Sequence, residues 1–418
     1  MKHHYLTCAL LLSSVIITPA KEANWTPTLD PAKAQELAVE GRTLEVFRHP
    51  SQAAWGYEKP QEDSFVVMHP TTEQKHAPLY VVLHSAGHDV NSCVKCTRQV
   101  GNHDIYHAPA DFYALYVDCR ANGGDWWWGG MHAKDENLTR KNGGLDPVPV
   151  ERRVIDTVKW VMTTYGIDAN RVYLCGNSMG GSGTLGIGLR NGDLFAAIKA
   201  NVPAGVEHAA NRMGFPPFAR PANVRIPDPP IVIDYSAPND QWSFGHDRFV
   251  QAMNDRKYPL YAYWGPFGHA NNHANILKVN DLINSFDWLS VKKNEAYAVF
   301  TNASNNDPLP WPDHLGEKAP GQVNAFFRWK TLEDSKEQLR MSLFLTSAND
   351  LKTTFTIPTE ARADVSIRRM QHFPVKANES INWVYGKTSG KVTADAEGVV
   401  TLPEIQITTK AEVLTLAR

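Results

Sequence analysis

Ser178 is the residue of this 418-residue sequence whose setting points most directly to chemistry. It lies in the pattern Gly176-x-Ser178-x-Gly180, after an apolar run (residues 171–175) and before a stretch of small residues. The apolar run predicts a buried strand, and the small residues predict a helix. A serine at such a strand-to-helix turn is typical of a nucleophile elbow, where glycines flank it because larger side chains would collide. The alternative is an ordinary glycine-rich turn, and we favour the nucleophile.

A nucleophilic serine needs a general base and an acid that orients the base. In the chain order serine, acid, histidine, both partners follow later strands of a sheet. Asp240 lies at loop distance after the apolar run at 229–236, whereas Asp234 lies on the run itself and is expected to point into the packing or sideways. We therefore predict Asp240 as the acid.

His269 is the predicted general base. It follows the apolar run at 259–265 and comes directly after a glycine, which allows the close approach that a base requires. His273 is the nearer alternative along the chain, and His246 is the more distant one.

An acyl-transfer site also needs two backbone N–H groups to stabilise the oxyanion. The first is predicted to be that of Met179, directly after the nucleophile. The second is predicted to come from the loop after the apolar run at 78–85, at Ser85 or Ala86. The alternative for this loop is a plain turn.

Short apolar, β-branched runs alternate with helical patterns and must position these groups. The runs predicted to be strands are 78–85, 112–119, 171–176, 229–236 and 259–265. The segments predicted to be helices are 148–166, 180–192, 246–257 and 274–290. This alternation predicts an α/β fold with a mostly parallel sheet and helices on both faces.

After about Val291 the pattern changes to alternating runs separated by turn residues, with no convincing long helix. These runs are 323–332, 339–347, 353–359, 364–373 and 412–418. They predict a small all-β domain of the sandwich type. The predicted division of the chain is a signal peptide (1–20), an N-terminal segment (21–60), a catalytic domain (61–290) and a C-terminal β domain (291–418).

The first 20 residues indicate export. A basic start precedes an apolar run (residues 6–17) and small residues, which is typical of a secretory signal cleaved after about Ala20. The run is too short to span a bilayer and no later run is long enough, so we expect a mature protein without a membrane span, in a bacterial periplasm or outside the cell. A net charge of −2 without a long basic run gives no electrostatic basis for binding nucleic acid. No motif requires a cofactor.

Four cysteines follow the signal sequence. They are Cys93, Cys96, Cys119 and Cys175. An even number of cysteines in an oxidising compartment favours disulfides. Cys93 and Cys96, with His103 and His107, make a zinc site the alternative, although the gap of six residues between the two pairs is shorter than in zinc fingers.

Four stretches carry a resemblance to a known family. "LHSAGHD", "GIDANRVYLCGNSMGG", "APNDQW" and "FGHANNH" together resemble a secreted α/β-hydrolase esterase of the polyhydroxybutyrate depolymerase, feruloyl esterase and acetyl xylan esterase group. Some likeness extends to prolyl oligopeptidase-type catalytic domains. The resemblance covers roughly residues 60–290. The chain departs from the group in "HSAG", where many relatives have His-Gly-Gly or His-Gly, and in its C-terminal β domain.

The resemblance implies a serine esterase that hydrolyses acyl groups on polysaccharide or related carbohydrate esters. Two alternatives are a serine peptidase of prolyl oligopeptidase-like type and an inactive, carbohydrate-binding hydrolase homologue. A complete set of serine, acid and histidine weighs against the inactive homologue. Only about 40 to 60 residues precede the core, which leaves no room for the propeller domain of such a peptidase.

Tryptophans are the candidate substrate-binding residues. A strand cannot easily bury three in a row, so some of Trp126, Trp127 and Trp128 should line a cleft, unless this loop is a clamp packed on the scaffold. Trp242 lies beside the predicted acid. Trp311, in a proline-flanked loop, is either a cleft wall or a packed residue of the interdomain seam. The segment 203–227 is expected to cover the site as a cap.

Overall fold

The computed structural model describes residues 25–98, 104–119, 125–127, 147–204, 226–269, 273–311, 319–351, 353 and 355–418, together with the single positions 206, 209 and 213. The predicted signal peptide, His103, Trp128 and most of the predicted cap segment lie outside these residues.

A large sheet runs through the described part of the chain, in the order β1-β2-β3-β5-β4-β6-β7-β8-β9-β11. The bounds are β1 Thr28–Leu29, β2 Leu44–Pro50, β3 Glu62–Met68, β4 Leu79–Leu83, β5 Tyr113–Val117, β6 Val172–Asn177, β7 Ala197–Asn201, β8 Ile231–Ser236, β9 Leu260–Trp264 and β11 Gly321–Val323. Neighbouring strands from β5 to β9 are parallel, and the strands at the two ends are antiparallel. The predicted α/β class and mostly parallel sheet are confirmed.

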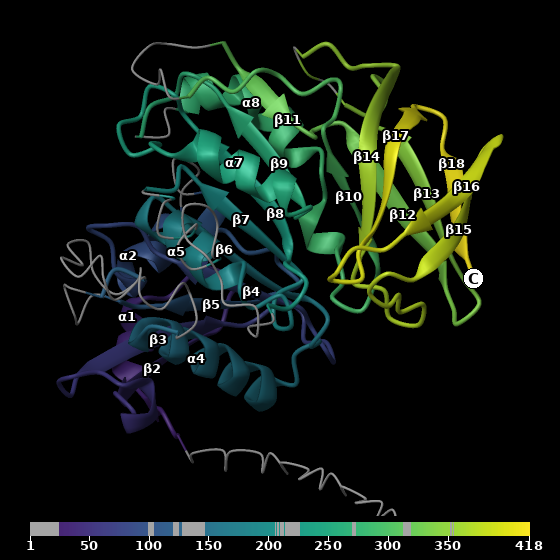
Figure 1. Ribbon diagram of the computed structural model, residues 1–418. Coiled ribbons are helices and arrows are strands. Elements are labelled where there is room, and N and C mark those ends of the chain that lie inside the picture. Colours follow the sequence, from purple (N-terminus) through teal and green to yellow (C-terminus); the bar gives the residue numbers. More distant parts are fainter. Residues whose placement is uncertain are drawn as a thin grey trace, which may run out of the picture.

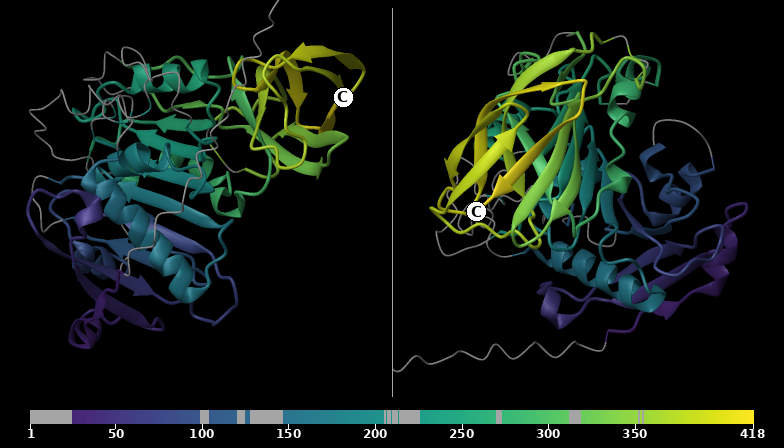
Figure 2. Two further views of the ribbon diagram at one scale, coloured as in Figure 1. Left: turned by 60° about the horizontal axis from the view of Figure 1, so that its bottom comes forward. Right: turned by 90° about the vertical axis from the view of Figure 1, so that its right-hand side faces the viewer.

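Helices cover both faces of this sheet, as Figures 1 and 2 show. The bounds are α1 Pro31–Glu36, α2 Val90–Cys96, α4 Pro149–Tyr165, α5 Met179–Gly188, α7 His246–Asp255 and α8 His273–Asn284. Side chains of α4, α5 and α7 join one apolar core, and side chains of α2 and α8 join the other. α4 ends at Tyr165 and is capped by Gly166, whose φ of 63° is left-handed and therefore suits glycine. α5 ends earlier than predicted, at Gly188 rather than near Gly192.

The C-terminal part forms two further sheets, in the orders β10-β14-β17 and β12-β13-β18-β15-β16. The bounds are β10 Tyr297–Thr301, β12 Phe327–Asp334, β13 Gln338–Leu345, β14 Glu360–Arg368, β15 Ser380–Tyr385, β16 Thr388–Thr393, β17 Val400–Thr408 and β18 Glu412–Ala417. Both lie to one side of the large sheet (Figure 1). The predicted all-β character is confirmed, but the described residues of run 353–359 form no strand.

Strands from different predicted domains pair with one another. β2, from the predicted N-terminal segment, pairs with β3 along its whole length. β11, from the predicted C-terminal domain, pairs with β9 of the large sheet. In addition, one apolar core runs without a break from the large sheet into the sandwich, and it includes Tyr261 of β9, Phe286 after α8 and Leu343 of β13. The C-terminal strands are therefore packed onto the large sheet.

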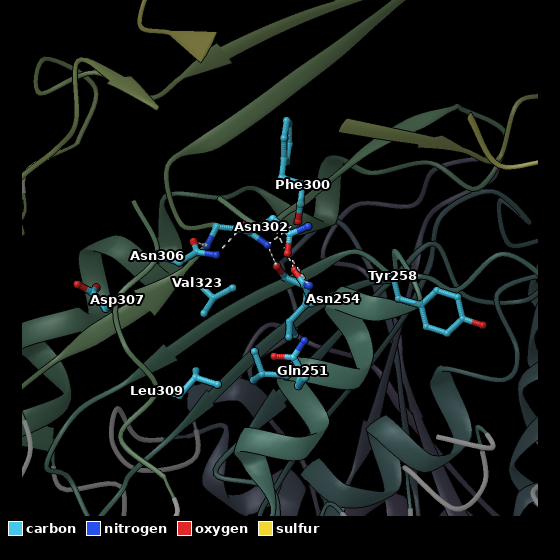
Figure 3. A pocket seen from close by; sticks show the side chains of 12 residues that line it. Gln251, Asn254, Tyr258, Phe300, Asn302, Asn306, Asp307, Leu309 and Val323 are labelled. Atoms are coloured by element: carbon cyan, nitrogen blue, oxygen red, sulfur yellow. Dashed lines mark hydrogen bonds between the residues drawn. The ribbon is translucent and has the colours of Figure 1, made fainter. Parts of the chain in front are cut away.

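Residues 302–311 run along α7 and tie the sandwich to the large sheet. At the last turn of α7, the Asn302 backbone N–H donates to Asn254 Oδ1 over 2.9 Å. At the first turn, the Trp311 ring stacks on His246 with centroids 5.0 Å apart. Between these contacts lies a pocket of about 180 Å³, whose wall includes Leu309 (Figure 3).

The four cysteines are free thiols in this structure, so the disulfide interpretation is corrected. Cys93 and Cys96 are three residues apart on α2, where Cβ atoms are about 5–6 Å apart, beyond the roughly 3.5–4.5 Å of a disulfide. Cys175 is buried in the central strand β6. Among the described residues, no group of three potential metal ligands comes together, and no helix is long and apolar enough to cross a membrane.

Candidate active site

Ser178 lies between the end of β6 and the start of α5, in a strained conformation. Its φ of 55° and ψ of −116° are rare for a residue with a side chain, and such strain clusters at functional sites. The Ser178 N–H donates to the Asn201 carbonyl over 2.9 Å and helps hold this conformation. A Cβ atom on Gly176 would lie 2.3 Å from the Gly180 carbonyl oxygen, and one on Gly180 would lie 1.9 Å from the Leu83 oxygen. The flanking glycines are thus required by close backbone approach.

A chain of hydrogen bonds joins the three predicted catalytic side chains. Ser178 Oγ lies 2.7 Å from His269 Nε2, and His269 Nδ1 lies 2.7 Å from Asp240 Oδ2. If Nδ1 carries the proton, it donates to the carboxylate and leaves Nε2 free to accept the serine proton. The structure brings Ser178, His269 and Asp240 together, from three different loops at the carboxyl ends of β6, β9 and β8.

The loops that carry the acid and the histidine are tied to each other. Asp240 is buried, and its Oδ1 accepts a hydrogen bond from the Trp242 N–H over 2.8 Å. Next to it, Asn239 Oδ1 accepts one from the Gly268 N–H over 2.9 Å. Gly268 has a φ of 62°, so the turn that presents His269 uses a left-handed residue.

The alternative residues form a separate pair. Asp234 and His246 are both buried, with His246 Nε2 3.4 Å from Asp234 Oδ2. His246 Nδ1 donates to the Ser243 carbonyl over 2.7 Å. Burial acts to lower the pKa of His246, but the Asp234 carboxylate and the hydrogen bonds outweigh it and raise this pKa above its ordinary value. The side chain of His273 lies outside the described residues.

One of the predicted oxyanion donors is already occupied. The Ser85 N–H donates to the Tyr106 hydroxyl over 2.9 Å, so it is not available to an oxyanion, and the prediction for Ser85 is corrected. Ala86 is exposed on the same loop. The Met179 N–H begins α5, where the first N–H groups of a helix have no partner within the helix. Met179 and Ala86 remain the candidates.

Trp127 is buried, with 1% of its surface exposed, and acts as a clamp. Its Nε1–H donates to the His84 carbonyl over 2.9 Å. The Trp127 side chain also packs against Gly183 of α5, so closely that a Cβ atom on Gly183 would lie 2.5 Å from the Trp127 Cβ. The ring thus joins the loop after β4 to α5. It has no free face for a substrate, so the substrate-binding prediction for Trp127 is wrong.

The other tryptophans differ in exposure. Trp311 is 6% exposed, and its Nε1–H donates to Ser243 Oγ over 2.9 Å, so it is a packed residue of the seam rather than a cleft wall. Trp126 is half-buried. Trp242 is 45% exposed, and its ring centroid lies 6.3 Å from that of His269. Trp242 is therefore the tryptophan that the structure places at the surface beside the candidate site.

Sequence reasoning missed the buried cluster around Arg153 of α4. Its guanidinium lies 3.5 Å from Asp63 Oδ2 and 3.7 Å from Asp125 Oδ2, and Nε donates to the Tyr57 hydroxyl over 3.0 Å. Burial raises the pKa of Asp125 to about 6, although Arg153 opposes this shift. Asp125 directly precedes the Trp126–Trp127 loop, so the cluster anchors that loop. No spacing in the sequence relates these four residues.

No protein-family model matches this sequence, and no curated protein matches it. Solved structures do. A thermostable esterase is 21% identical over 49% of this chain and 52% of its own, with a TM-score of 0.35, so this chain spans about half of that esterase's length. A fluorophosphonate-binding serine hydrolase of Staphylococcus aureus is 14% identical over 58% and 97%, with a TM-score of 0.37.

A third solved structure is the CE1 ferulic acid esterase of the anaerobic fungus Anaeromyces mucronatus. It is 16% identical over 60% of this chain and 95% of its own, with a TM-score of 0.39.

Proposed function

We propose that this chain is an exported serine esterase that hydrolyses acyl groups on polysaccharide or related carbohydrate esters. The observation that carries the proposal is the unbroken hydrogen-bond chain from Ser178 through His269 to Asp240, with 2.7 Å at both links. The strained backbone of Ser178 supports the same role, because a nucleophile elbow presents its hydroxyl in this way.

In the proposed reaction, Ser178 Oγ attacks the acyl carbon while His269 Nε2 takes the hydroxyl proton. Asp240 stabilises the imidazolium that forms. The oxyanion accepts hydrogen bonds from the N–H groups of Met179 and Ala86. His269 then donates its proton to the leaving alcohol, and an acyl-enzyme remains. Water attacks the acyl carbon with His269 as general base, which releases the carboxylic acid and restores Ser178.

The sugar preference rests on Trp242. Its exposed indole lies next to His269, the group that protonates the leaving alcohol. Flat indole faces suit sugar rings, so a sugar alcohol as leaving group fits this position. Phe244, two residues further along the same loop, is 50% exposed.

The nucleophile is tested with Ser178→Ala. We expect this variant to lose turnover of p-nitrophenyl acetate by a factor on the order of 10⁶ and to lose labelling by a fluorophosphonate probe. Ser182→Ala is the matched control, because Ser182 lies on the same helix but its Oγ donates to the Ala204 carbonyl. Wild-type turnover or labelling in Ser178→Ala would contradict the assignment.

The substrate class is tested separately. A panel of acetylated, feruloylated and methyl-esterified polysaccharides should include a substrate, and a peptide anilide should not be cleaved. Preferential cleavage of the anilide would favour the peptidase. Export is tested by the N-terminal sequence of the mature protein, which we expect to begin after about Ala20.

A further inference from the structure

A second pocket, of about 250 Å³, lies on the other face of the large sheet from α5. Its walls come from β4, β7 and β8, from η2 (Asp104–Tyr106) and from α8. The side chains that matter here are Lys199 and Asn201 of β7, with Asn284 of α8 opposite. Ser178 is not among its lining residues, so this pocket is distinct from the candidate active site.

Lys199 places an ammonium group in the wall of the pocket, which Asp104 also lines. Its Nζ donates to Asn284 Oδ1 over 3.4 Å, and among the described residues no carboxylate, that of Asp104 included, lies within ion-pair distance of it. Burial lowers the pKa of Lys199 to about 8, and only the Cys175 thiol acts in the opposite direction. Lys199 is half-buried on β7, and a carboxylate bound in the pocket would pair with its ammonium group.

Asn201 adds an unused hydrogen-bond acceptor. It lies two residues after Lys199, so both side chains point to the same face of β7. It is only 5% exposed, and its Oδ1 has no hydrogen-bond partner among the described residues. Buried polar atoms are normally paired, so an orphan acceptor on a pocket wall indicates a missing donor.

We propose that this pocket binds a small hydroxylated carboxylate. The ligand's carboxylate would accept from Lys199 Nζ, and its hydroxyl would donate to Asn201 Oδ1. A volume of about 250 Å³ accommodates a molecule of this size. Because the ligand's carboxylate and its hydroxyl each make a contact, a carboxylate without the hydroxyl should bind less tightly.

The first experiment is calorimetric titration of the full chain at pH 7 with glycolate and with acetate. We expect saturable binding of glycolate at one site, and at least threefold weaker binding of acetate. Lys199→Met should weaken glycolate binding at least tenfold, whereas Lys292→Met, an exposed lysine outside the pocket, should leave it unchanged. Asn201→Leu should abolish the difference between the two ligands.

Two further measurements test the proposal even if a pocket variant fails to fold. Ser178→Ala should bind glycolate like the wild type, because the pocket is separate from the candidate active site. In the wild type, affinity should fall about 30-fold from pH 7 to pH 9.5 as Lys199, with a pKa of about 8, loses its proton.

Other ionisable groups near Lys199 must be considered for this pH arm. They are Tyr80 of β4, Cys175 of β6, Tyr235 of β8, and Asp104 and His107 beside η2. Burial raises the pKa of Cys175 to about 12 and that of Tyr80 well above its ordinary value, so both keep their protons at pH 9.5. Loss of the pH dependence in Lys199→Met would assign it to Lys199.

Three results would overturn the proposal. They are no saturable binding by the wild type, wild-type affinity in Lys199→Met, and loss of binding in Ser178→Ala. The last would place the ligand at the elbow and would leave the proposed esterase function untouched, so the two proposals fail independently.

Discussion

Replacing Asp240 by asparagine changes one charge in the candidate site while keeping its shape. The Trp242 N–H, 2.8 Å from one oxygen of Asp240, decides how the new amide lies. Because this N–H needs an acceptor, the asparagine oxygen faces Trp242 and the NH₂ group faces His269. A donor then meets His269 Nδ1 at the position where a carboxylate oxygen lies at 2.7 Å. The histidine proton is driven to Nε2, where it can no longer accept the Ser178 proton.

The expected loss in turnover is about 10³- to 10⁴-fold, the range for an acid-to-amide change in a serine–histidine–aspartate site, which corresponds to about 4–5.5 kcal/mol. The assay is kcat/KM on p-nitrophenyl acetate. Asp234→Asn is the matched control, because it makes the same chemical change in a buried carboxylate that contacts His246 instead of His269. We expect its turnover to stay within about threefold of the wild type. If Asp234→Asn loses more activity than Asp240→Asn, the assignment of the acid is refuted.

Three further predictions concern the framework around the site. Gly180→Ala should yield little soluble protein on expression, because its Cβ would lie 1.9 Å from the Leu83 oxygen and the backbone cannot give way by that much. His246 has a raised pKa in the folded state, so its pairing with Asp234 stabilises the fold fully below the unfolded pKa and this contribution is lost as pH rises through the folded pKa. The Tm difference between wild type and His246→Gln should therefore be larger at pH 5.5 than at pH 9, and an equal difference would contradict the pairing. Trp311→Phe keeps a ring on His246 but removes the N–H donated to Ser243, so unfolding in urea should show a loss of about 1 kcal/mol, with turnover of small and polymeric esters reduced equally or not at all.

Long-range contacts decided the elements that the sequence analysis missed. β7 contains Lys199 and Asn201, whose polar side chains interrupt the apolar run, yet it pairs with β6 and β8 in the middle of the sheet. β2 and β11 lie at or near the two ends of the sheet. β11 pairs with β9 from a distant part of the chain, and β2 joins the sheet through β3, so their strand state depends on pairing more than on local composition.

The sequence also predicted much of the candidate site. The geometry around Ser178 follows from local sequence, because a buried run, two glycines and a helix of small residues leave few other conformations. The choice of Asp240 and His269 over Asp234 and His246 also agrees with the contacts in the structure, since the loop distances after β8 and β9 limit where each side chain can reach.

By itself, the sequence determined the α/β class, the strand-to-helix turn at Ser178 and the change to an all-β pattern near residue 291. These depend on the periodicity of apolar residues and on glycine, which act over a few neighbouring positions. Only the tertiary structure decided that Tyr106 occupies the Ser85 N–H, that Trp127 and Trp311 are buried, and that Lys199 faces a pocket. Burial and hydrogen-bond partners are set by residues distant in the chain, and a sequence pattern records the type of a side chain but not what packs against it.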